Sequence, residues 1–168
     1  MKTLYVLRHA KSDWGDESLR DFDRPLNHRG RKAARAVGRE MRERGICPDL
    51  VIASPAVRAK ETLERVLEGF GRDVRVTEDR QIYEAGTGTL LEIVRAAPDD
   101  VEHLMIVGHN PGFQNLVVTL TEPCALREEA GEKFPTGALA EIRFSIDRWS
   151  AVAAGAGQLE DLIKPRDL

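Results

Sequence analysis

The sequence predicts an α/β protein, a three-layer α/β/α sandwich with a mostly parallel central sheet. Short apolar runs alternate along the chain with longer segments in which apolar residues recur at helical spacing. One run, residues 104–107, is apolar without interruption, which is typical of a strand covered by helices on both faces. Strands that alternate with helices favour a parallel sheet between two helical layers. At 168 residues, the chain is expected to form a single domain over residues 1–168.

Five runs are predicted as strands, because they are apolar or alternating and are bounded by polar or turn residues. In chain order they are residues 3–8, 50–53, 74–76, 104–107 and 138–146. The last run places apolar side chains from Ala138 to Phe144 on one face, which indicates a strand that alternates between core and solvent. Gly155 and Gly157 mark a turn after it. The tail from Gln158 is expected either to return as an edge strand or to lie loosely on the surface.

Four segments are predicted as helices, because a capping residue precedes apolar residues at helical spacing. They run approximately over residues 27–44, 54–68, 89–97 and 110–120. Asn27 can cap the first helix, and Gly45 ends it. Ser54 is a natural N-cap for the second helix, with Pro55 at its first helical position.

The two later helices follow the same logic. Thr89 can cap the third, which Pro98 ends. Asn110 and Pro111 repeat the cap-plus-proline pattern at the start of the fourth. Two polar stretches are predicted as loops: residues 11–25 and 122–134.

Composition excludes several classes of protein. The apolar fraction of 42% and the charged fraction of 32% fit an ordinary globular protein, and the net charge of −3 provides no basic field to attract nucleic acid. The first apolar run, residues 4–7, is too short for a signal peptide or a membrane span. Cys47 and Cys124 lack metal-ligand spacing and are expected to be free thiols. We therefore expect a cytoplasmic protein without membrane or nucleic-acid partners, and a monomer because no apolar stripe is left over.

Arginine and histidine residues follow three of the predicted strands. Arg8 and His9 end the first strand, Arg58 follows the second, and His109 follows the strand at 104–107. Because ligands bind outside the carboxyl ends of parallel strands, these four side chains are expected to share one cationic pocket.

This combination of residues points to phosphoryl transfer. Arg8 and Arg58 can bind a phosphoryl group through planar, permanently charged guanidinium groups. A neutral histidine can attack phosphorus, and neighbouring arginines disfavour the imidazolium form. Spacing alone leaves open whether His9 or His109 attacks. No carboxylate cluster accompanies them, so we expect no metal and no other cofactor, while His28 and His103 are predicted as surface residues.

Three motifs resemble those of the histidine phosphatase superfamily, the group that also contains the cofactor-dependent phosphoglycerate mutases. They are Arg8-His9-Ala10, Ser54-Pro55 followed by Arg58-Ala59 and Glu61-Thr62, and Gly108-His109-Asn110. Two further segments resemble its bacterial phosphohistidine phosphatase branch, the SixA-like proteins. These are Arg24-Pro25-Leu26 with Gly30, and Phe134-Pro135-Thr136-Gly137. The resemblance runs from Leu4 to about Phe144 and implies a phosphoglycerate mutase-like fold.

The resemblance also implies roles for individual residues. It makes His9 the nucleophile that forms a phosphohistidine intermediate, and it makes Arg8, Arg58 and His109 the residues that hold the phosphoryl group. Glu84 lies where the family often places a carboxylic general acid. The chain departs from the family at Ala10, where the motif has Gly, and after Trp14, where mutase-like members carry Asn and this chain has Gly15. The second departure is expected to remove a phosphate contact.

The spacing between Glu84 and His109 bears on the substrate. Only 24 residues separate them, and one helix and one strand occupy most of this span, so little chain is left for a lid. An open pocket admits a phosphorylated side chain of another protein. Imidazole also leaves from phosphohistidine with less help from an acid than an alkoxide needs. We therefore expect a metal-independent phosphatase of protein phosphohistidine. The alternatives are a phosphatase of a small phosphorylated metabolite and a phospho-ligand-binding module without turnover.

Overall fold

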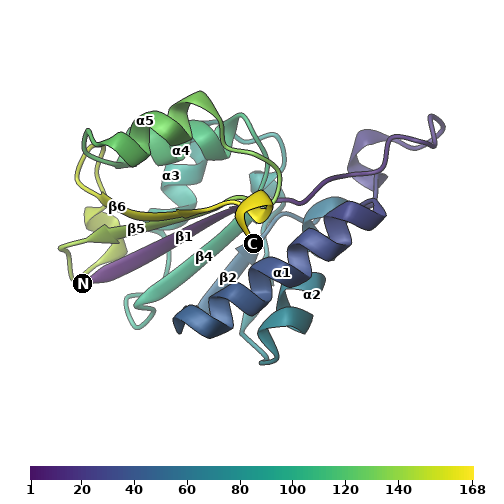
Figure 1. Ribbon diagram of the computed structural model, residues 1–168. Helices are drawn as coiled ribbons and strands as arrows, with labels where there is room; N and C mark the ends of the chain where they lie inside the picture. The colour runs from purple at the N-terminus through teal and green to yellow at the C-terminus, as the bar shows by residue number, and fades with distance from the viewer.

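Six strands form one sheet between two layers of helices in the computed structural model, which describes residues 1–168 (Figure 1). The strands are β1 (Lys2–Arg8), β2 (Leu50–Ala53), β3 (Val76–Glu78), β4 (His103–Gly108), β5 (Leu139–Phe144) and β6 (Gln158–Ile163). The helices are α1 (His28–Arg44), α2 (Val57–Phe70), α3 (Thr87–Arg95), α4 (Gly112–Leu120) and α5 (Ala125–Glu132). Short 3-10 turns cover residues 21–23, 80–82, 149–151 and 165–167. The predicted α/β sandwich is confirmed.

The strands follow the order β3-β2-β4-β1-β5-β6 across the sheet. β1 lies near the middle, parallel to β4 on one side and antiparallel to β5 on the other. β2 pairs in parallel with both β3 and β4, so only the two pairings of β5 are antiparallel. The mostly parallel sheet is therefore confirmed, and the tail from Gln158 forms the edge strand, one of the two outcomes that its sequence allowed.

Figure 1 shows α3, α4 and α5 over one face of the sheet and α1 and α2 over the other. Side chains of β1 alternate between these two layers. Leu4 and Val6 pack in the core beneath α3 and α4, whereas Tyr5 and Leu7 pack in the core beneath α1 and α2. Burial on both faces is the reason why the strand is apolar at successive positions. None of the helices is both long enough and apolar enough to cross a bilayer.

Two glycines allow α1 and α2 to lie in close contact. A Cβ atom on Gly38 of α1 would overlap the carbonyl oxygen of Val66, and one on Gly69 of α2 would overlap that of Arg35. These obstacles are backbone atoms, which cannot rotate away as a side chain does. The helices must therefore separate to accept even one methyl group, which would disturb the core beneath both of them.

Gly38→Ala is expected to lower the free energy of unfolding by about 3 kcal/mol, because it overpacks this helix–helix contact. Gly88→Ala is the matched control, since Gly88 lies in α3 with open space around its Cβ position. That substitution should raise stability by up to about 1 kcal/mol through helix propensity. Urea denaturation of the three proteins measures both effects. Equal unfolding midpoints for Gly38→Ala and Gly88→Ala would contradict the role of close helix packing.

The start of α2 differs from its prediction. The helix begins at Val57 with Ala56 as its N-cap, and no side chain caps it. Ser54 is therefore not the N-cap, and Pro55 does not occupy the first helical position. The Ser54 hydroxyl instead lies 2.8 Å from Nε2 of His109. The hydroxyl therefore serves a long-range partner, and its oxygen accepts locally only from the N–H of Ala56, the residue before the helix.

The third helix and the strand before it also begin at different residues from those predicted. α3 begins at Thr87 after Gly86, so Thr89 lies inside the helix and does not cap it. Burial of Leu90 and the apolar residues that follow it holds this helix in place without a side-chain cap. The third strand covers residues 76–78 and not 74–76. It is a short, exposed strand, for which hydrophobicity is a weak guide.

The predicted loop at 122–134 contains a helix, α5. Only Ala130 of this helix is buried, so the apolar stripe that normally reveals a helix is missing from its sequence. Its N-cap is Cys124, whose sulfur accepts from the backbone N–H of Arg127 at 3.4 Å. Packing against α4 stabilises a segment whose own pattern is weak. Cys124 and Cys47 are free thiols, as predicted.

Candidate active site

The carboxyl ends of β1, β2 and β4 meet at one edge of the sheet, on the right in Figure 1, where the segment 11–25 leaves the body of the molecule. His9 follows β1, Ser54 follows β2 and His109 follows β4. Backbone hydrogen bonds extend the sheet to these residues, from His9 N–H to Gly108 C=O and from Ser54 N–H to Val107 C=O, both at 2.9 Å. The sheet therefore fixes the relative positions of the side chains at its edge.

His9 is held in one orientation by its own backbone. Its Nδ1 lies 2.7 Å from the carbonyl oxygen of Ala10, and a carbonyl oxygen can only accept, so Nδ1 carries the proton. Nε2 then keeps its lone pair, and it hydrogen-bonds to no protein atom. The ring is 5.3 Å from that of His109, centroid to centroid, and His9 is only 7% exposed. This arrangement presents an unprotonated nitrogen to the pocket.

The surroundings keep both histidines neutral. Burial, opposed by a hydrogen bond to Ala10 that favours the charged form and assisted by the charges of Arg58 and Arg8, lowers the pKa of His9 to about 4. Burial also lowers the pKa of His109 to about 3, with His9 and Arg58 adding to the effect. At neutral pH each ring therefore has one unprotonated nitrogen.

Both histidines are expected to make the folded protein less stable as the pH falls below about 6.5. Their pKa values in the folded state, about 4 and about 3, lie below the ordinary value of 6.5, so the unfolded state binds more protons and stability rises with pH. The free energy of unfolding should fall by about 1 kcal/mol per pH unit for each histidine, as urea titrations between pH 7 and 4.5 would show. His9→Gln should lose about half of this slope. His28→Gln changes an exposed histidine and should keep the slope; identical slopes in both variants would contradict the prediction.

Arg58 lies in the first turn of α2 and is anchored by the segment 11–25. Its guanidinium group donates to the backbone oxygen of Asp21 at 2.7 Å and to Oδ2 of the same residue at 3.0 Å. The Tyr83 hydroxyl donates to Oδ2 as well, at 2.6 Å. These contacts hold the Arg58 side chain, which is mostly buried, at one place beside His9 and His109.

Arg8 is oriented by a different loop. Its Nη1 donates to the carbonyl oxygen of Phe134 at 3.0 Å, an oxygen that also accepts from the Asn110 side chain at 3.0 Å. Nε of Arg8 is buried and has no partner. Burial and the nearby positive charge of Arg58 both lower the pKa of Arg8. Two guanidinium groups therefore lie close together with only one carboxylate bonded to them, which favours the binding of an anion.

His109 contributes a further unused polar atom. Ser54 Oγ accepts from the N–H of Ala56 at 3.2 Å, so its hydroxyl proton is free to be donated to Nε2 of His109, at 2.8 Å. In this arrangement Nδ1 of His109 carries a proton, and that atom is buried without a protein partner. Buried donors without partners are rare in proteins and indicate a place where a ligand completes the hydrogen bonding.

Comparison with known proteins identifies the family. The family model described as histidine phosphatase superfamily (branch 1) matches residues 4–104, more than half of the chain. An uncharacterized protein of Mycobacterium tuberculosis is 34% identical over 164 residues, which cover 95% of this chain and 100% of the relative. The chain belongs to the histidine phosphatase superfamily.

Solved structures of this superfamily share the whole fold. The SixA protein of Agrobacterium tumefaciens, named as a candidate phosphohistidine phosphatase, superposes with a TM-score of 0.84 at 28% identity, over 98% of each chain. The corresponding protein of Nakamurella multipartitia gives a TM-score of 0.82 at 28% identity, over 98% of this chain and 96% of that one. The match to the superfamily supports phosphatase activity for this chain.

Glu84 lies near Arg58 and His109, at a cavity whose lining does not include His9 or Arg8. Its side chain is exposed and lines a cavity of about 470 Å³ together with Arg58, His109, Asp21 and the residues around them. Its backbone has φ = 59°, in the left-handed region that non-glycine residues seldom occupy. This conformation belongs to the turn between the 3-10 turn at 80–82 and α3.

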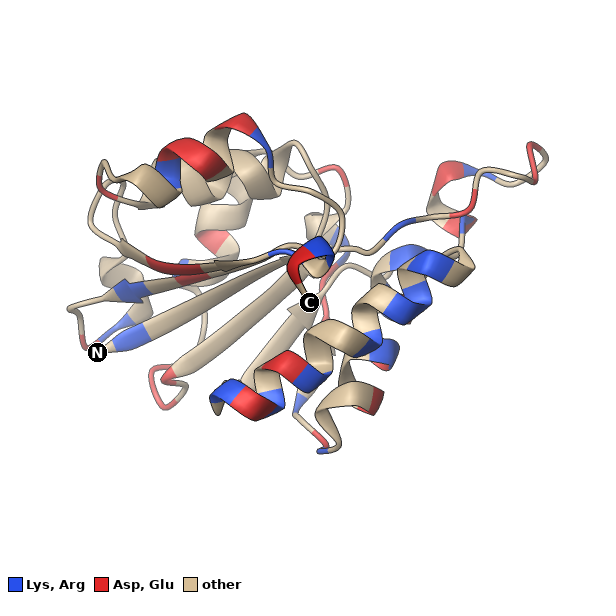
Figure 2. Ribbon diagram, viewed as in Figure 1, with Lys and Arg blue, Asp and Glu red and all other residues tan.

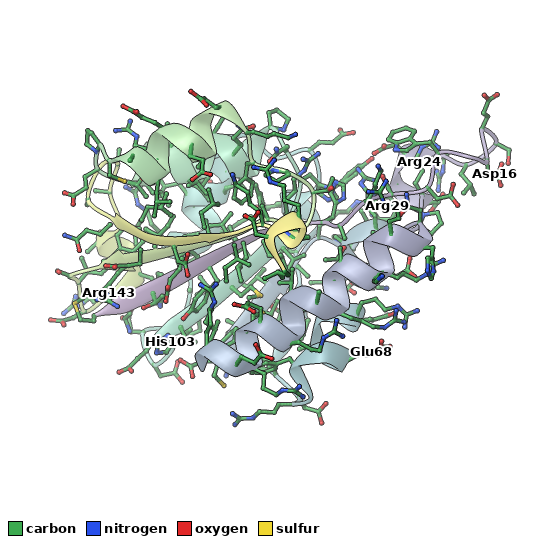
Figure 3. All side chains as sticks on the ribbon, viewed as in Figure 1. Asp16, Arg24, Arg29, Glu68, His103 and Arg143 are labelled. Atoms are coloured by element: carbon green, nitrogen blue, oxygen red, sulfur yellow. The ribbon has the colours of Figure 1, made fainter.

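The segment 11–25 forms a wall of the site through two residues that no sequence motif marked, Asp21 and Phe22. The span between Glu84 and His109 is occupied by α3 and β4, as predicted, and supplies no lid. Instead, Phe22 packs edge-on against Tyr83, with ring centroids 5.0 Å apart, and Asp21 bonds to Arg58. Figure 3 shows the tip of the segment, at Asp16, projecting away from the body of the molecule. The pocket is thus bordered by the loop that directly follows the His9 motif, and Asp21 of this loop reaches Arg58 across 37 residues.

Several residues of this site carried no recognisable sequence signal. Asp21 and Tyr83 reach Arg58 only through the tertiary fold, and Ser54 was predicted for a different role. The Phe134 carbonyl oxygen acts through the backbone, which no side-chain pattern reveals. Of the two remaining histidines, His28 is exposed as predicted, whereas His103 is half-buried and stacks on Tyr5 at 6.3 Å.

Proposed function

We propose that this chain is a phosphatase that works without a metal ion, through a phosphohistidine formed on His9, and that its substrate is protein phosphohistidine. The observation that carries the proposal is the state of His9. Its Nε2 is unprotonated and free of protein partners, while two arginines and a buried donor of His109 lie around it. A nucleophile and the groups that stabilise a transferring phosphoryl group are therefore combined in one pocket.

The first step is the attack of the Nε2 lone pair of His9 on phosphorus, while the bond from phosphorus to the substrate breaks. Arg8, Arg58 and Nδ1–H of His109 hold the phosphoryl oxygens and stabilise the charge that spreads over them. When the substrate is a phosphohistidine protonated on its other nitrogen, a neutral imidazole leaves. The ring of phosphorylated His9 then carries the positive charge that the substrate ring carried, and its Nδ1–H remains bonded to Ala10 C=O.

The second step is hydrolysis of the intermediate. A water molecule attacks phosphorus and the bond to Nε2 of His9 breaks, which restores the neutral imidazole. The water oxygen and its protons leave with phosphorus as inorganic phosphate, so atoms and charge balance. His9 is then ready for another substrate.

Three features favour a protein substrate. The chain has no insertion between Glu84 and His109 that would enclose the pocket. A side chain presented by another protein can therefore reach His9. Solved structures similar to this one over nearly the whole chain are named as candidate phosphohistidine phosphatases. An imidazole leaving group also needs little help from the exposed Glu84.

The proposal is tested by comparing kcat/KM on a chemically phosphorylated phosphohistidine protein and on a panel of phosphorylated sugars, glycerates and nucleotides. We expect the phosphohistidine protein to be preferred by at least about 100-fold, with the same rate in the presence of EDTA. A preference of similar size for one metabolite would assign a small-molecule substrate instead. Loss of activity in EDTA that added metal restores would refute the metal-free mechanism.

Glu84→Gln is expected to show whether Glu84 donates a proton to the leaving group. A general acid matters most for a poor leaving group, so the rate on an alkyl phosphate should fall about 100-fold and the rate on an aryl phosphate less than about threefold. Glu92→Gln is the control, because Glu92 is an exposed carboxylate of α3 that lines a different cavity, and it should change neither rate. Equal small effects of Glu84→Gln on both esters would show that Glu84 has no catalytic role.

A further inference from the structure

A second cavity, of about 650 Å³, runs along α1 beside the short turn at 165–167. Its most prominent side chains are four exposed cations: Lys11, Arg29, Lys32 and Arg39. We call this cavity the basic groove. Figure 2 shows blue along most of α1, with red only toward the C-terminal part of that helix.

The basic groove has a defined shape. Three of its cations, Arg29, Lys32 and Arg39, project from α1 at spacings of three and seven residues, which place them on one face of the helix. Between them, the small side chains of Ala33 and Ala36 leave the space open. The three cations span ten residues of helix, or about 15 Å. Figure 3 marks Arg29 at the start of α1.

Four of the five cations that line the basic groove have no partner within the chain, whereas the fifth, Arg166, is paired with Asp167 at 3.8 Å. None of the four takes part in an ion pair or a side-chain hydrogen bond, although exposed arginines nearby, such as Arg35 and Arg44, are paired. The groove also contains Glu40 and Glu43, but Glu40 is bonded to Arg44 at 2.6 Å and both lie toward its far end. In a chain of net charge −3, these unpaired cations make a local positive surface.

The groove begins next to the candidate active site. Lys11 is two residues beyond His9, and Gly30 allows α1 to pack directly on the Lys11 backbone. The opposite wall includes Pro135 and Thr136, and the next residue, Gly137, donates its N–H to His9 C=O at 2.9 Å. One wall thus contacts the backbone of Lys11, and the other is bonded to the backbone of His9 itself.

We propose that the basic groove binds an acidic segment of the phosphorylated protein substrate while its phosphohistidine reaches His9. This inference rests on the proposed function and adds the kind of substrate surface that the enzyme selects. The groove extends about 15 Å, beyond the reach of a small phosphorylated metabolite. No aromatic side chain lines it, so it lacks the stacking platforms that single-stranded nucleic acids use. A carboxylate-rich peptide fits both its charge and its length.

Two phosphohistidine peptides of equal length provide the test. One carries glutamates on both sides of the phosphohistidine, and the other carries glutamines at the same positions. Wild-type enzyme should hydrolyse the acidic peptide with a kcat/KM at least about tenfold higher, and the preference should fall as sodium chloride is raised. p-Nitrophenyl phosphate measures the chemical step without any docking contact.

Lys32→Glu/Arg39→Glu should reduce the preference for the acidic peptide to less than about twofold and leave p-nitrophenyl phosphate turnover unchanged. The matched control is Arg72→Glu/Arg75→Glu, which alters two exposed, unpaired arginines. They lie near the start of β3, whereas His9 follows the carboxyl end of β1. The control should keep the preference. Equal hydrolysis of the two peptides by wild-type enzyme, or the same loss in both double variants, would overturn the proposal.

Direct binding separates this proposal from the proposed function. Fluorescence anisotropy with a labelled, unphosphorylated acidic peptide should show binding to wild type that Lys32→Glu/Arg39→Glu weakens about tenfold. If p-nitrophenyl phosphate is hydrolysed but neither phosphohistidine peptide is, the substrate assignment fails, and the anisotropy result alone decides whether the groove binds acidic chains. Absence of binding at low salt would refute the proposal that the basic groove binds acidic segments.

Discussion

Replacing His9 by alanine is expected to lower kcat/KM by about four orders of magnitude or more. The variant loses the only nitrogen of the pocket that is both unprotonated and free of protein partners. The remaining arginines still bind phosphate, but no other nucleophile lies in place to take the phosphoryl group. His109 cannot substitute readily, because Ser54 holds its Nε2 and the proposed proton on Nδ1 blocks the other nitrogen. The loss should therefore appear mainly in kcat.

The intermediate itself can be trapped. Brief incubation with a phosphorus-labelled substrate and rapid denaturation should leave label on His9 that is stable to alkali and labile to acid. The His28→Ala variant, which changes an exposed histidine on α1, should retain both label and turnover. Label on His109, label retained in His9→Ala, or wild-type turnover by that variant would contradict the assignment of His9 as nucleophile.

The second large effect is expected at Arg58. Arg58→Ala should lower kcat/KM by about 100- to 1000-fold, the loss typical of removing one preorganised donor from a transition-state site. Arg58→Lys should restore little of it, because a lysine cannot provide the planar fork that bonds both to Asp21 and to a phosphoryl oxygen. The side chain is mostly buried and held in place, so its contribution requires no reorganisation during the reaction.

Steady-state kinetics on an aryl phosphate measure this effect. Arg35→Ala is the control, since Arg35 is an exposed arginine paired with Glu68 on the outer surface of α1 and α2. It should change kcat/KM less than about twofold. Full rescue by Arg58→Lys would show that charge alone suffices, and a loss confined to KM would show that Arg58 binds the ground state and the transition state equally.

The sequence predicted the cationic pocket because its signals are local. Each motif consists of an apolar strand followed at once by Arg8 and His9, by Ser54 and Arg58, or by His109. In a parallel sheet such strand ends share one edge. Once the strands are identified, the motifs are therefore predicted to lie together without knowledge of any contact between them. The choice of His9 over His109 came only from family resemblance, and the hydrogen bond to Ala10 now gives it a physical basis.

Local signals failed where a distant partner competed with them. Ser54 has the chemistry of an N-cap, but His109, 55 residues away, takes its hydroxyl, and α2 begins without a side-chain cap. Asp21 has no distinguishing spacing, yet it anchors Arg58 across 37 residues. α5 lacks a strong apolar stripe and depends on packing against α4. In each case the deciding contact joins residues that no short-range pattern relates.

The sequence by itself therefore determined a mostly parallel sheet between helical layers and the placement of four charged or titratable residues at the ends of its strands, because periodicity and strand-end position depend only on neighbouring residues. The tertiary structure alone decided how those residues are held: the proton position on His9, the anchoring of Arg58 by Asp21, and the groove in which cations of α1 face the loop at 135–136. Burial, pairing and tautomer depend on what approaches each group from elsewhere in the chain, and only folding determines that.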